Sequence, residues 1–142
     1  MSVFCKTAEG VAVFAMALLS AASLAFAANG FDCKFPSGIV NTFENEVYQA
    51  APANLLSFEI GDIDLRRQTA AIVTPKGKGG LKIVRAIGAN HFLEVINEGF
   101  LNITTIYETP AADGSLPAVH SRHFGLLGMP VVSQYHGTCK PK

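Results

Sequence analysis

Two polar segments near the C-terminus contain the residue types from which binding and catalytic sites are built. Residues 120–123 read His-Ser-Arg-His, and residues 133–136 read Ser-Gln-Tyr-His. Histidine can ligate metals or transfer protons, serine can act as a nucleophile, and the planar guanidinium of arginine suits carboxylate and phosphate groups. These segments are therefore the first candidates for a functional site.

Strand alternation suggests how the polar side chains are grouped. In an extended strand, alternate side chains share a face, so His120 and Arg122 project together. If Gln134 and His136 project from the same face of a neighbouring strand, the four form one compact polar patch, because cross-strand neighbours lie about 4.5–5.5 Å apart. We interpret these four residues as a candidate ligand-binding site that recognises an anionic or hydroxylated group through Arg122.

A structural interpretation of the same residues remains open. Arg122 would then pair with a local acid such as Glu94 or Glu108, and the histidines would bind backbone groups at strand ends. The sequence does not decide between a binding site and a scaffold.

Motifs for catalysis and metal binding are incomplete. The chain has four histidines, at positions 91, 120, 123 and 136, and no two have the i, i+4 spacing of helical metal ligands. Ser121 and Ser133 lack the Gly-x-Ser-x-Gly sequence of a nucleophile elbow. We predict no catalytic residue, metal or cofactor. The alternative is a hydrolase or metal-dependent enzyme that uses the histidine-rich C-terminal strands.

Composition places these segments in a small globular protein. The 142 residues include 49% hydrophobic residues, enough to form a core, and their number suits one domain. Eleven basic and eleven acidic side chains give a net charge of +0. Such a chain has no positive field for holding phosphates, so we expect no nucleic-acid partner.

The spacing of apolar residues predicts an all-β fold. From Phe31 onward apolar residues recur at every second position, and turn-forming residues interrupt them regularly. The pattern indicates an antiparallel meander of about eight strands, forming a small closed barrel or a flattened sandwich. We expect a turn at 36–38 (Pro-Ser-Gly) and a possible short helix at 44–51.

The N-terminal segment is typical of a secretory signal peptide. An apolar stretch runs over Val11–Ala28 and ends in Ala25-Phe26-Ala27, the small residues that signal peptidases select. We predict cleavage after Ala27, so that residues 28–142 form a single β-barrel domain that is periplasmic or secreted and not inserted in a membrane. An uncleaved membrane anchor is the alternative.

Two cysteines of the mature chain lie near its ends. Because disulfides persist in exported proteins, we predict that Cys33 and Cys139 form one, which would tie the termini together. Two free buried thiols are the alternative.

The combination of a leader, a small all-β domain and a cysteine near each end resembles the small periplasmic barrels that inhibit c-type lysozyme. The Gly/Ser- and Tyr-containing loop that such proteins insert into lysozyme is not found in this sequence, so the resemblance implies a layout and no site residue. Segments 120–123 and 133–139 also resemble uncharacterised small exported bacterial proteins.

These observations favour a non-enzymatic exported binding module. Its partner would be a small apolar or anionic molecule inside the barrel, or an envelope protein bound by the loops. A structural envelope-interaction module is a further alternative to the enzyme described above. The sequence identifies neither the ligand nor the oligomeric state.

We predict that mature protein recovered from the periplasm begins at Ala28, or within one residue of it, because signal peptidase cleaves after small residues such as Ala25 and Ala27. Mass analysis of the N-terminus measures this. Recovery of the intact leader in the membrane fraction would contradict both the cleavage site and the soluble exported location.

Overall fold

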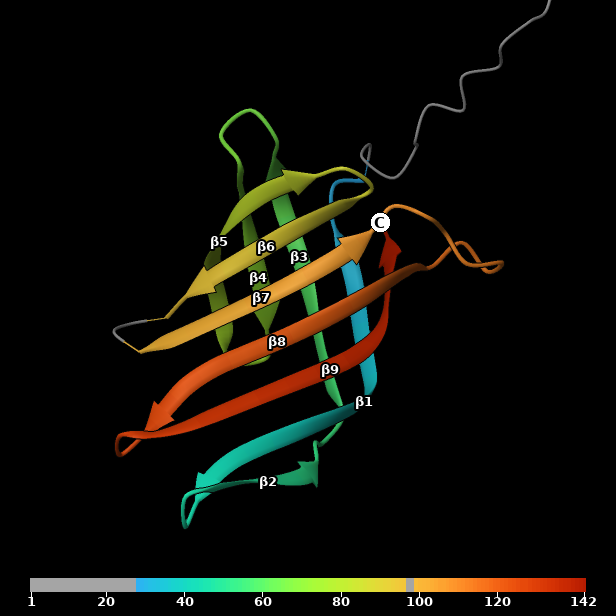
Figure 1. The fold of residues 1–142 in the computed structure, drawn as a ribbon. Helices are drawn as coiled ribbons and strands as arrows, with labels where there is room; N and C mark the ends of the chain where they lie inside the picture. The colour runs from blue at the N-terminus through green and yellow to red at the C-terminus, as the bar shows by residue number, and fades with distance from the viewer. Residues whose placement is uncertain (1–27, 97–98) are drawn as a thin grey trace, which may run out of the picture.

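The computed structural model describes residues 28–96 and 99–142, and these form an antiparallel β-sheet of nine strands without a helix (Figure 1). The strands are β1 (Phe31–Glu44), β2 (Val47–Pro52), β3 (Leu56–Asp64), β4 (Thr69–Thr74), β5 (Gly77–Ala86), β6 (Ala89–Val95), β7 (Phe100–Tyr107), β8 (Leu116–Leu126) and β9 (Met129–Pro141). No helix in this described part is long and apolar enough to cross a membrane. The predicted leader and its cleavage site lie outside the described residues.

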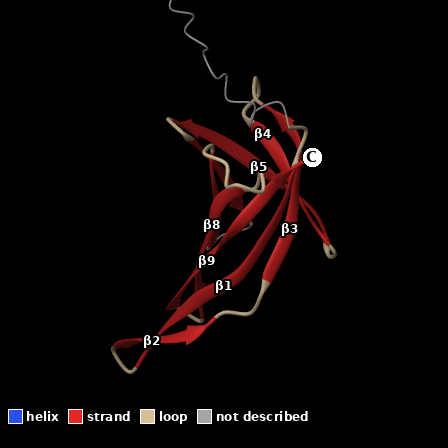
Figure 2. Cartoon of the chain, turned by 90° about the vertical axis from the view of Figure 1, so that its right-hand side faces the viewer, coloured by secondary structure: helices blue, strands red, loops and turns tan. Residues whose placement is uncertain are grey.

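The sheet closes on itself. Neighbouring strands follow the order β2-β1-β3-β4-β5-β6-β7-β8-β9, and β1 also pairs with β9. Eight strands, β1 and β3 to β9, therefore form a closed barrel, while β2 pairs with β1 alone and lies outside it. The all-β prediction is confirmed, and the closed barrel is the form that the chain adopts. Strand β2 lies at the end of the molecule away from the C-terminus (Figures 1 and 2).

Strand β1 is long because it pairs with two different strands, β3 and β2, along one of its edges. Its residues 31–35 pair with β3, and its residues 39–44 pair with β2. Along its other side it pairs with β9, with a shift of register between Lys34 and Ser37. The turn predicted at 36–38 is therefore wrong. Pro36 lies within an irregularity of one continuous strand, where its missing N–H breaks no ladder hydrogen bond.

The backbones of β1 and β9 approach closely at this irregularity. Gly137 of β9 lies beside it, and a Cβ at this position would collide with the carbonyl oxygen of Lys34. Glycine is thus required for the first and last strands to pair here.

The helix predicted at 44–51 is also wrong. Strand β1 continues to Glu44, and a two-residue turn at Asn45 and Glu46 leads directly into β2. Both turn residues have positive φ, 50° and 66°. This is the conformation of the hairpin turns whose twist matches that of the flanking strands. The side chains of β2 are all exposed, so this segment has no apolar face that a helix would bury.

One end of the barrel is filled with large apolar side chains. Phe35 and Phe58 stack with ring centroids 5.5 Å apart, and Phe92 lies edge-on to Phe31 at 6.2 Å. Ile60, Ile72, Leu81, Ile83, Ile106 and Leu116 complete this core. This packed end carries the two described termini and the connections β3–β4, β5–β6 and β7–β8.

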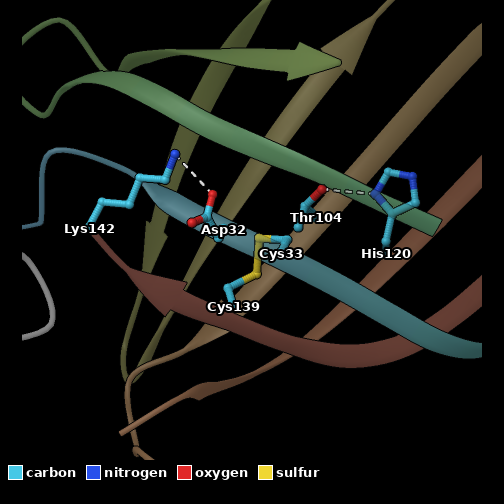
Figure 3. Close-up of a disulfide and its surroundings, with 6 residues drawn as sticks. All are labelled: Asp32, Cys33, Thr104, His120, Cys139 and Lys142. Atoms are coloured by element: carbon cyan, nitrogen blue, oxygen red, sulfur yellow. Dashed lines mark hydrogen bonds and ion pairs between the residues drawn. A yellow bond between two sulfur atoms is a disulfide. The ribbon is translucent and has the colours of Figure 1, made fainter. Parts of the chain in front are cut away.

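The predicted disulfide between Cys33 and Cys139 is confirmed (Figure 3). The two cysteines lie directly opposite each other in the β1–β9 register, and both are buried in the core. Beside them, the Nζ atom of Lys142 lies 2.9 Å from a carboxylate oxygen of Asp32 and 2.7 Å from one of Glu59. The crosslink is compatible with an oxidising, exported compartment.

Non-reducing mass analysis should find the purified chain two hydrogens lighter than the reduced chain, with no alkylatable thiol. Replacing either cysteine by serine should lower the free energy of unfolding by about 2–5 kcal/mol, the range typical of native disulfides in small secreted domains. Urea unfolding measures this change. Free thiols in freshly purified protein that has not been exposed to reductant would contradict the crosslink.

Candidate functional site at the barrel mouth

The end of the barrel opposite the disulfide is hollow. A cavity of about 410 Å³ opens there, between the start of β3, the end of β4 and the inner faces of β6, β7 and β8. Its apolar walls include Leu56, Phe58, Ile72, Phe100 and Phe124. We call this cavity the barrel mouth. One half of the barrel is thus filled by the core phenylalanines Phe31, Phe35, Phe58 and Phe92, and the other half is an open cavity.

A row of polar side chains crosses the inner wall of the barrel mouth. Glu94 of β6 pairs with Asn102 of β7, Asn102 pairs with Arg122 of β8, and Arg122 pairs with Ser133 of β9. Glu94, Asn102 and Arg122 line the cavity. The Nδ2 atom of Asn102 donates to Oε2 of Glu94 over 2.9 Å. A negative and a positive side chain therefore face the same cavity from strands that flank β7.

Arg122 is oriented by two neighbours and is not neutralised by either. Its Nε atom donates to Nε2 of His120 over 3.2 Å, and its guanidinium carbon lies 5.5 Å from the centroid of the Tyr135 ring. Within the described ranges, no carboxylate lies within ion-pair distance of Arg122. The local acids bind elsewhere: Glu94 to Asn102, and Glu108 to Asn90 over 3.3 Å.

His120 forms the boundary between the packed core and the barrel mouth. Only 1% of the residue is exposed, and its ring lies 5.1–5.9 Å from those of Phe58, Phe35 and Tyr135. Because arginine can only donate, Nε2 of His120 must accept, which places the ring proton on Nδ1. Nδ1 then donates to Oγ1 of Thr104 at 2.9 Å (Figure 3). Both ring nitrogens are satisfied in the neutral form.

Burial, and secondly the positive charge of Arg122, lowers the pKa of His120 from 6.5 to about 3. The imidazole therefore stays neutral in the folded protein at physiological pH. A neutral His120 can keep accepting from Arg122, whereas an imidazolium would repel it.

The structure separates the four residues that the sequence grouped together. Ser121 lies opposite Gln134, and Val119 lies opposite His136. Gln134 and His136 are consequently exposed on the outer face, while His120 and Arg122 face inward. The single patch of four is corrected to two inward residues, because Tyr135 and Ser133, not Gln134 and His136, are their inward neighbours on β9.

Sequence reasoning missed Asn102 and Tyr135 as neighbours of Arg122, and it named Glu94 only as an ion-pair partner, which the structure does not show. Glu94 has the same strand parity as the core residue Phe92, and Asn102 has the same parity as the buried Thr104. Because alternate residues of a strand share a face, this spacing alone would have placed the side chains of Glu94 and Asn102 inside the barrel. The register between strands, which brings them beside Arg122, has no signal in a single sequence.

The remaining histidines lie apart from the barrel mouth. His91 contacts Oγ1 of Thr105 through Nδ1 at 2.9 Å, and His123 and His136 are exposed. Across the residues that the structure places, no three His, Cys, Asp or Glu side chains gather in a group that could hold a metal ion.

No family model, curated protein or solved structure matches the chain. The barrel mouth is the feature from which we infer a function. Its inner wall combines an oriented cation, a carboxylate and apolar surface, the combination typical of sites for small molecules.

The low pKa of His120 predicts an acid-sensitive stability. Between pH 6.5 and about 3 the unfolded chain binds a proton at His120 that the folded chain does not, so stability falls as pH falls through this window. Replacing His120 by Gln should reduce the slope of unfolding free energy against pH, near pH 5, by up to about 1.4 kcal/mol per pH unit. Urea unfolding from pH 4.5 to 7.5 measures it. The exposed His123→Gln variant is the control, and equal slopes for all three proteins would contradict the burial of a neutral imidazole.

Proposed function

We propose that this protein is a non-enzymatic, exported binding module that takes a small molecule with an anionic group into the barrel mouth. One observation carries the proposal: Arg122 lines the cavity with its guanidinium oriented by His120 and Tyr135, and no described carboxylate neutralises it. Only Nε of the guanidinium has a hydrogen-bond partner among the described residues. The terminal N–H groups can therefore donate to a carboxylate or phosphate.

The size and walls of the barrel mouth suit an amphipathic ligand. A volume of about 410 Å³ lies within the range of roughly 300–1,000 Å³ typical of small-molecule sites. Phe100 and Phe124 stack with centroids 5.2 Å apart and rings 9° from parallel, and Phe100 is 43% exposed. This aromatic pair offers an apolar surface next to Arg122 along β8. A ligand with an anionic group and an apolar body could use both.

The orientation of Arg122 favours binding because less side-chain freedom is lost when the ligand arrives. A long, rotamer-rich side chain that is ordered on binding costs about 0.5–1.5 kcal/mol. The hydrogen bond to His120 and the contact with Tyr135 restrict Arg122 before a ligand is present. His120 is itself fixed by Thr104, so the support extends into the core.

The same contacts argue against the enzymatic alternative. Both ring nitrogens of His120 are engaged, by Thr104 and by Arg122, so its ring has no nitrogen free for proton transfer to a ligand. His123 and His136 are exposed and do not line the cavity, and Ser121 projects from the opposite face to Arg122. Binding without chemistry is the function that this geometry supports best.

Replacing Arg122 by Ala should weaken the binding of amphipathic anions by about 10- to 100-fold, because a hydrogen bond to a charged group contributes about 1.5–3 kcal/mol. Octanoate, phenylacetate and phenyl phosphate serve as probes, titrated against ¹⁵N-labelled protein. Backbone shifts should cluster on β7 and β8 around the barrel mouth. Arg122→Lys should give an intermediate loss, because it keeps the charge and loses the planar fork.

Arg66→Ala is the matched control, since Arg66 is exposed in the β3–β4 turn at the packed end of the barrel. Melting temperatures separate a binding defect from a folding defect. Equal binding by wild type and Arg122→Ala, or shifts confined to other surfaces, would reject the proposal.

A further inference from the structure

We infer that the ligand of the barrel mouth is a zwitterion whose cationic group is bound by Glu94, as its anionic group is bound by Arg122. This inference rests on the proposed function and specifies its ligand. It follows from the placement of two opposite charges in one cavity without an ion pair between them.

Glu94 is held in place much as Arg122 is. Its Oε2 atom accepts from Asn102, and its Oε1 atom lies 2.8 Å from the position that a Cβ at Gly79 would take. Glycine at 79 therefore leaves room for the carboxylate against the backbone of β5. Across residues 28–96 and 99–142, no lysine, arginine or histidine lies within ion-pair distance of Glu94.

Opposite charges that share a partly desolvated cavity attract each other more strongly than they do in water. Here Asn102 lies between the two strands and binds Glu94, while His120 and Tyr135 hold Arg122 on the other side. The carboxylate of Glu94 and the guanidinium of Arg122 are thus held apart, and each remains available to bind a ligand group on its own side of the cavity. A ligand that carries both countercharges would complete both sites together.

Glu94 and Arg122 reach the cavity from two strands that are not adjacent, and the strand separation sets an upper scale for the distance between the ligand's charges. Strands β6 and β8 flank β7, so their backbones are about 10 Å apart at a strand spacing of about 4.8 Å. The two charges of an α-amino acid are attached to one carbon, so this ligand would require the ends of Glu94 and Arg122 to converge from strands about 10 Å apart. An extended peptide advances about 3.3–3.6 Å per residue, so the free ends of a di- or tripeptide span roughly 7–11 Å.

The apolar walls complete the match. Leu56, Phe58, Phe100 and Phe124 line the same cavity as the two charges. Apolar side chains of a short peptide would be buried against them, with its termini on Glu94 and Arg122. The ligand class is therefore a short apolar peptide with free ends.

Three matched ligands test this inference on the wild-type mature protein: Leu-Leu, N-acetyl-Leu-Leu and Leu-Leu-amide. The blocked forms each lack one charge. We expect Leu-Leu to bind at least tenfold more tightly than either blocked form, by ¹⁵N chemical-shift titration, and more tightly than free leucine.

Variants assign each charge to its residue. In Glu94→Gln, which keeps shape and removes charge, N-acetyl-Leu-Leu should bind as well as Leu-Leu. In Arg122→Gln, Leu-Leu-amide should bind as well as Leu-Leu. Gly79→Ala should weaken only the ligands that carry a free amine, because the added Cβ displaces the Glu94 carboxylate. Glu108→Gln, at the packed end, is the control and should change nothing.

The outcomes separate this inference from the proposed function. If N-acetyl-Leu-Leu binds wild type as tightly as Leu-Leu, and Glu94→Gln has no effect, the zwitterion is rejected while anion binding at Arg122 stands. If Leu-Leu-amide binds as tightly as Leu-Leu, Arg122 has no role and both proposals fail. If only free leucine binds, the inferred charge separation is wrong. The comparison on wild type decides even if a variant does not fold.

Discussion

The pairing of β1 with β9 is the constraint on which the other features of this molecule depend. It turns a meander with two free edges into a barrel, and closure creates an inside for alternate side chains to face. The pairing in turn requires the irregularity at Pro36 and the absence of a side chain at Gly137, where the two backbones meet. The disulfide and the Lys142 ion pairs secure the same junction at its end.

Along the barrel axis the interior changes from a packed core to a cavity that contains charged side chains, and His120 lies where it changes. On one side of it lie the stacked phenylalanines and the disulfide, and on the other lie Arg122, Asn102 and Glu94. A buried polar group is tolerated when its hydrogen bonds are made, and both nitrogens of His120 have partners. The packed core therefore restricts the position of Arg122 through two hydrogen bonds, from His120 to Thr104 and from Arg122 to His120. The candidate site is held by secondary structure and packing, and among the described residues that line it only Ile96 lies outside a strand.

Features that depend on neighbouring residues in the sequence were predicted correctly more often than features that depend on which strands pair. Alternation of apolar residues is local and indicated the strands, and two cysteines in a chain predicted to be exported left one natural pairing. The face of β8 was ambiguous, because Val119 and Phe124 are both apolar and have opposite parity; only the register with β9 shows that Tyr135 faces His120. Turn geometry at Asn45 and Glu46 was overlooked in favour of a helix. Glu94 was named only as a possible ion-pair partner of Arg122, since nothing in one sequence shows which strands become neighbours.

Because the barrel closes between its first and last strands, its interior appears late in biosynthesis. Strand β1 is the first of the nine strands to be synthesised. Its Cys33 can form the disulfide only after Cys139, 106 residues later, has been added to the chain. Until β9 arrives, hairpins from β3 to β8 can form only an open sheet, with one edge of β1 unpaired and the future cavity wall exposed to solvent. The incomplete chain can therefore form strands, but it cannot form the barrel mouth. Arg122 acquires its Tyr135 neighbour, and with it a complete binding wall, only when the last dozen or so residues join the sheet.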